Sequence, residues 1–289
     1  MLSNEMKYII KASLSKNNQV IFEFGSRFGE DTVSIAKNFP GACIYAFECN
    51  PNTVEACRKH CAQYSNIILT EKAISNKVGF IDFFPVDINA SICSNEATAH
   101  GSSSLLKLDY DKKTAQILNA NFVQQDAITV ETTTLKNFMD EHKIDKIDFM
   151  WMDIQGAEIM ALEGLGENID KVAVIHTEVC FRQIYAGQAF FLDINKFLIN
   201  RNFVLAGFRD YCPTHANVIY VNKKSEGIIK NIRKYCDSRN IKIISLEYTC
   251  IYILLKIKQY IKKILFDLLG EEGGKKFIKC IKKFYKRNK

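Results

Sequence analysis

The sequence lacks the short patterns that mark zinc fingers, disulfide frameworks and membrane spans. Its 289 residues include ten cysteines, but no Cys-x-x-Cys pair and no Cys/His cluster with zinc-finger spacing. Scattered cysteines of this kind indicate reduced thiols of a cytosolic protein. No stretch reaches the roughly 18 uncharged apolar residues of a spanning helix. The N-terminus lacks the basic start and apolar run of a secretory signal peptide. We therefore expect a cytoplasmic protein.

The net charge is only +7, but it is unevenly distributed along the chain. Lys223 to Lys289 contains 19 Lys or Arg and six Asp or Glu, a net charge of +13. Residues 1–222 hold the other 20 basic and 26 acidic residues and carry −6. Hydrophobic residues make up 47% and charged residues 25%, which excludes collagen, a disordered chain and a disulfide-dense mini-protein. The sequence thus predicts an acidic globular domain over 1–222 and a basic extension over 223–289.

Short apolar runs alternate with helical patterns along the acidic domain. Almost wholly apolar strands that alternate with helices are typical of a mostly parallel sheet covered on both faces. Strands are predicted at 20–24, 43–47, 67–69, 78–84, 128–132, 146–152, 172–177, 203–208 and 218–221. Helices are predicted at 31–38, 51–64, from Leu135 onward, 157–165 and 184–200.

Polar residues gather where four of these strands end. Ligands of such sheets bind beyond the carboxyl ends of the strands. Residues with that placement are Glu23, Gly25, Glu48, Asp153 and Glu178. The sequence therefore predicts a small-molecule site at this edge of the sheet.

The first two strand ends describe the chemistry of a ligand. The loop Gly25–Gly29 lacks the Gly-x-Gly-x-x-Gly of a pyrophosphate binder, and the Glu23 carboxylate would repel phosphate but attract a cation. Glu48 ends the second strand, where an acidic side chain can hold both ribose hydroxyls. An ordinary tight loop and a helix-capping Glu48 are the structural alternatives. Together the two glutamates favour a nucleoside with a positively charged amino-acid end.

The third acidic strand end is the run Trp151–Glu158. Asp153 closes a buried strand and could hold substrate, act as a base or ligate a metal. Gly156 permits the turn that follows. Glu158 stands in the first turn of the next helix, where a structural role beside the helix dipole is favoured.

These motifs resemble those of the FkbM family of S-adenosylmethionine-dependent methyltransferases. The family's opening Asp-x-Gly-Ala-Asn-x-Gly is similar to Glu23–Gly29, and its Phe-Glu-Pro-x-Pro to Phe47–Pro51. Its Lys-Ile-Asp-Val-Glu-Gly-Ala-Glu is similar to Trp151–Glu158. The steps at Ala73–Ser75 and Thr134–Leu135 also resemble family positions, and the match covers roughly residues 19–210.

Three residues depart from the family's motifs. Trp151 replaces a lysine, Gln155 replaces the first glutamate and Arg27 replaces the asparagine. If that lysine or glutamate is catalytic in relatives, its role is altered in this chain.

The resemblance implies an α/β fold of the class I, Rossmann-like methyltransferase type, with a seven-stranded, mostly parallel sheet and helices on both faces. It implies that S-adenosylmethionine lies over Gly25–Gly29 with its ribose at Glu48. The residues implied in donor binding are Glu23, Gly25, Ser26, Gly29, Thr32, Glu48, Asn50 and Ala73.

A weakly nucleophilic sugar hydroxyl needs a base or a metal to accept a methyl group. The candidate bases are Asp153, His176 and Glu178. His176 stands two residues before Glu178, so both would face one side of a strand. Its unperturbed pKa suits a base, and a core histidine is the structural alternative. Asp153 and Glu178 could together hold Mg²⁺ with waters.

Residues in two further segments are candidates for acceptor contacts. They are Ser103, within the serine loop 102–104, and Arg182, Tyr185 and Gln188 after the Glu178 strand. A solvated loop is the alternative for each. The remaining histidines are expected at surface or packing positions: His60, His100, His142 and His215.

The basic extension carries two amphipathic helical patterns, at 252–269 and 275–287, separated by glycines. Apolar residues share one helical face and lysines occupy the other, as in interfacial membrane anchors. We therefore expect residues 246–289 to bind an anionic membrane surface. Packing of the first helix on the body or on another subunit is the alternative. A nucleic acid is disfavoured because no recognised motif occurs and lysine outweighs arginine.

These features together predict an S-adenosylmethionine-dependent O-methyltransferase. It would act on a sugar hydroxyl of a surface glycan, or of a glycan precursor, as a peripheral protein at the inner face of the cell membrane. Methylation of a small secondary metabolite and a donor-binding adaptor without catalytic activity are the alternatives. The sequence is compatible with an oligomer.

Overall fold

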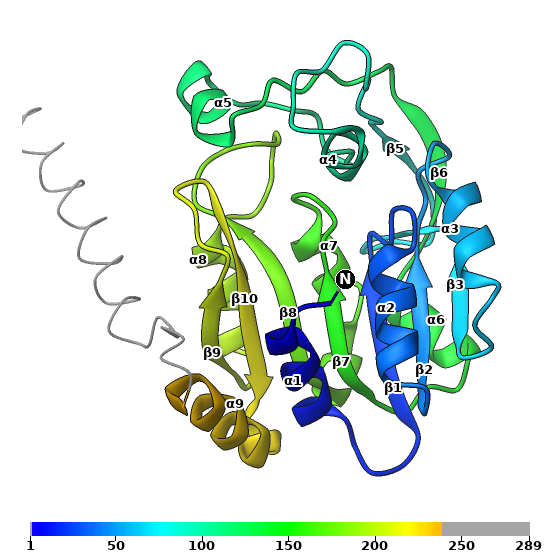
Figure 1. Cartoon of the computed structure of the whole chain (residues 1–289), viewed down its shortest axis with the longest axis vertical. Helices are drawn as coiled ribbons and strands as arrows, with labels where there is room; N and C mark the ends of the chain where they lie inside the picture. The colour runs from blue at the N-terminus through cyan, green and yellow to red at the C-terminus, as the bar shows by residue number, and fades with distance from the viewer. Residues whose placement is uncertain (1, 239–289) are drawn as a thin grey trace, which may run out of the picture. The chain divides into compact units, whose positions relative to one another are not determined.

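Seven strands form one sheet in the computed structural model, which describes residues 2–238 (Figure 1). Only β10 runs antiparallel to its neighbours β8 and β9, and the other pairings are parallel. This confirms the predicted seven-stranded, mostly parallel sheet. In sheet order the strands are β3 (Ile67–Thr70), β2 (Ala42–Phe47), β1 (Gln19–Phe24), β7 (Ile147–Met152), β8 (Val172–Cys180), β10 (His215–Asn222) and β9 (Phe203–Arg209).

Helices cover both faces of the sheet, as predicted. On one face, α1 (Asn4–Ser13), α2 (Glu30–Asn38) and α9 (Glu226–Ser238) pack onto the buried side chains Ile21, Phe149 and Val174. On the other face, Phe138 of α6 (Leu135–Glu141) contacts Phe22 and Phe47, with ring centroids 5.9 and 4.8 Å away. The further helices of the body are α3 (Val54–Cys61), α7 (Glu158–Glu163) and α8 (Phe191–Ile199), with short 3₁₀ turns at Gly166–Lys171 and Lys223–Ser225.

A long insertion lies above the carboxyl ends of the strands (Figure 1). It contains a three-stranded sheet, ordered β4 (Ala73–Ile74), β6 (Ile128–Thr133) and β5 (Gly79–Phe83). Between β5 and β6 lie two short helices, α4 (Glu96–Gly101) and α5 (Lys112–Leu118). The side chains of Asn95 and Asp111 cap them by accepting backbone N–H bonds from Thr98 and Thr114. The insertion therefore roofs the edge where the predicted site lies.

The structure differs from the predicted elements in several places. Helices α1, α4, α5 and α9 and the short strand β4 were not predicted. Helix α3 starts three residues later than predicted, at Val54, and strand β10 starts three residues earlier, at His215. Strand β8 continues through Glu178 to Cys180, beyond the predicted end at 177. The helix predicted at 184–200 starts only at Phe191, because the Gln188 side chain accepts the N–H groups of Ile184 and Tyr185 and holds that segment as a loop.

The chain divides into two units, Met1–Ile243 and Ile244–Lys289. The predicted boundary after residue 222 stays a prediction. Beyond it, Ile229 and Ile232 of α9 are buried in the core beside α1. No helix within residues 2–238 has the length and apolarity to span a membrane. The amphipathic patterns predicted at 252–269 and 275–287 lie outside the described residues.

Candidate active site

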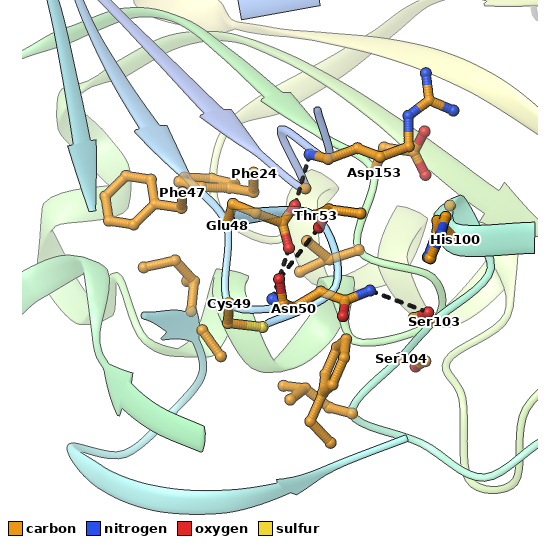
Figure 2. A pocket seen from close by; sticks show the side chains of 18 of the residues that line it. Phe24, Phe47, Glu48, Cys49, Asn50, Thr53, His100, Ser103, Ser104 and Asp153 are labelled. Atoms are coloured by element: carbon orange, nitrogen blue, oxygen red, sulfur yellow. Dashed lines mark hydrogen bonds between the residues drawn. The ribbon is translucent and has the colours of Figure 1, made fainter. Parts of the chain in front are cut away.

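A cavity with an empty volume of about 580 Å³ opens at the carboxyl ends of β1 and β2. Its walls combine apolar side chains, among them Phe47, Ile74 and Leu105, with the polar groups of Glu48 and Asn50. Figure 2 shows Glu48 and Asn50 at this cavity, with Ser103 within hydrogen-bonding reach of Asn50. We call this space the donor cavity.

Glu48 is a buried carboxylate held by the backbone. Its two oxygens accept N–H bonds from Arg27 at 2.5 Å and from Asn50 at 2.7 Å. Burial raises the pKa of Glu48 to about 7, against these hydrogen bonds, which lower it. Each carboxylate oxygen retains a second lone pair, so the group can still accept hydroxyl donors from a ligand.

Gly25 brings the ends of β1 and β7 together. Its φ is +84°, and a Cβ added there would lie 2.1 Å from the backbone oxygen of Asp153. Only glycine fits such an approach in left-handed backbone. The peptide of Gly25 and the start of the Asp153 loop thereby form one wall of the donor cavity.

The predicted donor residues fall into two groups. Gly25, Glu48, Asn50 and Ala73 line the donor cavity. The other four, Glu23, Ser26, Gly29 and Thr32, do not line it and lie around the β1–α2 turn.

The second group has structural partners. The Thr32 hydroxyl donates to the buried Glu23 carboxylate and ties α2 to β1. Burial raises the pKa of Glu23 to about 8, which disfavours the charged form expected to attract a cation. Gly29 adopts φ +83° against the Cys57 and Cys61 sulfurs. The sequence pattern marked this loop correctly but did not separate residues that face the ligand space from residues that shape it.

A second cavity, with an empty volume of about 970 Å³, adjoins the donor cavity. Both are lined by Arg27, Gly101 and Asp153. The second cavity is also lined by Gln155, Glu178, Tyr185 and His215, and by side chains of the roof such as Ser94, Thr98 and Asn119. We call it the acceptor cavity, and the three shared residues its junction with the donor cavity.

The acidic ends of β7 and β8 meet in the acceptor cavity. Gln155 Nε2 donates to Asp153 Oδ1 at 2.6 Å and to Glu178 Oε2 at 3.3 Å. Burial and the neighbouring carboxyls of Asp153 and Glu158 raise the pKa of Glu178 well above its usual value. Asp153 faces open cavity space, but the surrounding protein still raises its pKa through desolvation.

The two histidines near these carboxyls have different surroundings. His176 is 1% exposed, packs against Phe149 and Trp151, and lines neither cavity. Burial and then Arg209 lower its pKa to about 3. The expectation that His176 acts as a base therefore finds no support in this geometry. His176 is a core histidine, which was the structural alternative.

His215 was expected at a surface or packing position, but it lines the acceptor cavity. Its Nε2 lies 3.7 Å from Glu178 Oε1, and its Nδ1 lies 2.9 Å from the Thr214 hydroxyl. His100 also lines a cavity, beside Gly101 in the roof of the donor cavity. No local motif marks either histidine, because their chain segments reach the site only through the fold.

Of the predicted acceptor segments, Tyr185 and Ser102 of the serine loop line the acceptor cavity. Ser103 lies in the donor cavity instead, where its hydroxyl accepts from Val86 N and Asn50 Nδ2. Gln188 is buried and bonds to the backbone of residues 182, 184 and 185. Arg182 lines neither cavity. Gln188 is therefore a scaffold for the Tyr185 loop.

The predicted Mg²⁺ site does not fit the residues present. Within residues 2–238, no group of three or more His, Cys, Asp or Glu side chains is placed to hold a metal ion. The space between Asp153 and Glu178 is bridged by the Gln155 amide, whose N–H groups are donors and not ligands.

Residues 23–205 match the family described as the methyltransferase FkbM domain. The chain belongs to this family. It is also 30% identical over 184 residues to the 2-O-methyltransferase NoeI of Sinorhizobium fredii (strain NBRC 101917 / NGR234), covering 62% of this chain and 70% of that protein. The chain is therefore an S-adenosylmethionine-dependent methyltransferase.

Solved methyltransferases show more distant likeness to this FkbM methyltransferase. One is TrmK of M. capricolum in complex with S-adenosyl-homocysteine, at 13% identity and TM-score 0.39, covering 77% of this chain and 69% of that chain. Another is a putative methyltransferase from Streptococcus mutans in complex with SAH, at 9% identity and TM-score 0.38, covering 76% of this chain and 99% of that chain. The family assignment rests on the sequence matches.

The donor cavity of this FkbM methyltransferase fits S-adenosylmethionine in chemistry. Glu48 has spare lone pairs for ribose hydroxyls, and the apolar side chains of Ile74, Phe83 and Leu105 suit a purine ring. The backbone at Gly25 approaches Asp153 without an intervening side chain. The ribose and the base of a nucleoside thus find matching groups in this cavity.

Proposed function

We propose that this methyltransferase transfers a methyl group to a sugar hydroxyl bound in the acceptor cavity. The observation that carries the proposal is the junction, since Arg27, Gly101 and Asp153 line both cavities. Two substrates that fill the cavities would meet there, beside a carboxylate. Alignment of two reactants in this way is the main contribution a protein makes to such a displacement.

Each side of the junction has a defined task. S-adenosylmethionine, when bound, supplies a methyl group on positively charged sulfur. Glu48 accepts hydrogen bonds from the ribose, and Asn50 and Ser103 hold the adjoining wall. Asp153 is the carboxylate nearest both substrates and takes the proton of the acceptor hydroxyl.

The lining of the acceptor cavity favours a sugar over an apolar metabolite. Hydroxyl, amide and carboxyl groups point to an acceptor with several hydroxyls, and Phe122 and Ile184 provide apolar patches for a sugar face. The polar groups are those of Ser94, Thr98, Asn119, Gln155, Glu178 and Tyr185. The 30% identical relative is named a 2-O-methyltransferase, which also supports methylation of a hydroxyl oxygen.

We further propose that residues 246–289 hold the enzyme at the inner face of the cell membrane. The support is the charge of +13 over residues 223–289 and a sequence pattern that would place apolar residues and lysines on opposite faces of two helices. Lysines near an anionic membrane contribute about 1 kcal/mol each. The acceptor would then be a surface glycan or its lipid-linked precursor.

Donor binding tests the first proposal directly. Calorimetry with S-adenosylmethionine should show one site in the wild type and loss of binding in Glu48→Ala. Glu55→Ala, which removes an exposed glutamate of α3, should bind like the wild type. Absence of donor binding in the wild type would refute the proposal.

Radiolabelled donor then separates the acceptor classes. Label should enter the glycan-precursor fraction of a cell extract and not the fraction of small apolar metabolites. Label in neither fraction, with donor bound, would favour the adaptor.

Liposome flotation tests the membrane proposal. Full chain should float with vesicles that contain anionic lipid, and a chain without residues 246–289 should not. Equal flotation of both chains would contradict the anchor, and retention only at low salt would show a purely electrostatic attachment.

A further inference from the structure

Gln155 fills the gap between the acidic ends of β7 and β8 with an amide group. Its Nε2 lies 2.6 Å from Asp153 Oδ1 and 3.3 Å from Glu178 Oε2. Its Oε1 lies 2.9 Å from the hydroxyl of Tyr185. The residue has φ +54°, a left-handed conformation that a glutamine rarely adopts. The turn therefore places this side chain in the gap at an energetic cost.

The contacts place the two halves of the amide on different sides. The NH₂ group faces the oxygens of Asp153 and Glu178, and the carbonyl oxygen faces the Tyr185 hydroxyl. Tyr185 is 1% exposed, and its environment raises the pKa of its hydroxyl well above the usual value, so the hydroxyl stays protonated and can donate to Oε1. The backbone oxygen of Ser102 lies at the same distance of 2.9 Å from this hydroxyl, so the two acceptors share its single proton.

This arrangement is incompatible with a divalent cation between the two carboxyls. Mg²⁺ requires oxygen ligands at about 2.0–2.1 Å, and the amide nitrogen stands where the ion would lie. A glutamate, the residue of the family's motif at this position, would present oxygens there instead of N–H donors. The exchange of one side chain thus changes what the gap can hold.

We propose that Gln155 is a positioning residue that holds Asp153 and Glu178 as a metal-free carboxylate pair, with Asp153 as the proton acceptor. The proposal rests on the proposed function, because it concerns how the same site handles the acceptor's proton. The hydroxyl oxygen bonds to the methyl carbon as the carbon–sulfur bond breaks, and that electron pair stays on sulfur. The hydroxyl proton passes to Asp153 Oδ2, which accepts no hydrogen bond from another described residue.

Manganese binding by the full chain tests this proposal, with Mn²⁺ as the probe in calorimetry. Gln155→Glu should bind Mn²⁺ at least about tenfold more tightly than the wild type, because changes around a metal site alter affinity by about 10–100-fold. Gln155→Ala opens the gap without adding charge and should also bind more tightly than the wild type. The control Gln63→Glu adds the same charge at an exposed position just after α3 and should match the wild type.

Equal Mn²⁺ affinity of the wild type and both Gln155 variants would overturn the proposal, since the amide would then not decide what occupies the gap. Thermal melts of the variants show whether each is folded, and either variant alone suffices for the comparison. Donor calorimetry after EDTA treatment separates the two proposals. Loss of donor binding in the wild type refutes the proposed function, whereas donor binding with equal Mn²⁺ affinities refutes only the role of Gln155.

Discussion

Substitution of Gly25 by alanine tests whether the contact between β1 and β7 builds the donor cavity. Two costs are expected. An alanine at φ +84° costs about 1–2 kcal/mol from left-handed backbone alone. Its Cβ would lie 2.1 Å from the backbone oxygen of Asp153, so the two strand ends must separate by roughly 1 Å, and overpacking of this kind costs about 1–3 kcal/mol.

Gly187→Ala is the matched control. Gly187 has φ +73°, but a Cβ there meets no atom within 4 Å. It should therefore show the backbone cost without the steric cost. The two variants should differ in free energy of unfolding by about 1–3 kcal/mol, measured by urea denaturation of the full chain.

The same pair of variants separates stability from function. A displacement of roughly 1 Å at the junction can reduce a reaction rate about 100-fold, and it should also weaken S-adenosylmethionine binding in calorimetry. Gly187→Ala should bind the donor as the wild type does. The reasoning fails if Gly25→Ala matches Gly187→Ala in stability and the wild type in donor affinity.

Three further predictions concern side chains of the two cavities. Burial raises the pKa of Glu48 to about 7, and its ionised form accepts ribose hydroxyls best. Donor affinity should therefore rise from pH 6 to pH 8 in the wild type and lose this rise in Glu48→Gln; calorimetry that shows parallel profiles would contradict this. Tyr185→Phe should cost about 1–3 kcal/mol in urea unfolding because it leaves buried acceptors unpaired, whereas Tyr211→Phe, 57% exposed, should change stability by less than about 0.5 kcal/mol; equal effects would refute the buried network. His215→Asn should lower methyl transfer far more than donor affinity, because His215 lines only the acceptor cavity, and His60→Asn should alter neither; a parallel loss of donor binding would place His215 in the wrong cavity.

The fold was largely predictable because its strands are buried on both faces. Runs such as 43–47 and 146–152 are almost wholly apolar, and the observed strands begin and end within one residue of them. Helices were predicted less well. The pattern at 184–200 is apolar enough for a helix, but the Gln188 amide competes for the backbone N–H groups and delays the start to Phe191.

The principle that ligands bind beyond the carboxyl ends of parallel strands identified three carboxyl groups of the site, but not its histidines. Glu48, Asp153 and Glu178 all reach a cavity, as expected from their places at the carboxyl edge. Glu23 has the same place in sequence, yet the Thr32 hydroxyl satisfies it within the β1–α2 packing. His215 comes from an antiparallel strand, where this principle predicts nothing. Whether a side chain at this edge faces a cavity or packs inside the protein depends on tertiary contacts, and a single sequence does not show them.

Two of the three departures from the family's motifs share one unusual backbone conformation. Arg27 has φ +52° and Gln155 has φ +54°, and left-handed backbone costs such residues about 1–2 kcal/mol each. In return, the Arg27 N–H binds Glu48 while its guanidinium donates to Ala97 of the roof at 3.1 Å. Gln155 bridges the two acidic strand ends. Both strained turns therefore fix groups that line the acceptor cavity at or beside its junction with the donor cavity, and strain that persists in this way is a mark of functional sites. The departures are thus better explained as parts of this site than as tolerated substitutions, because both residues line the acceptor cavity and bond to carboxyl groups of the two cavities.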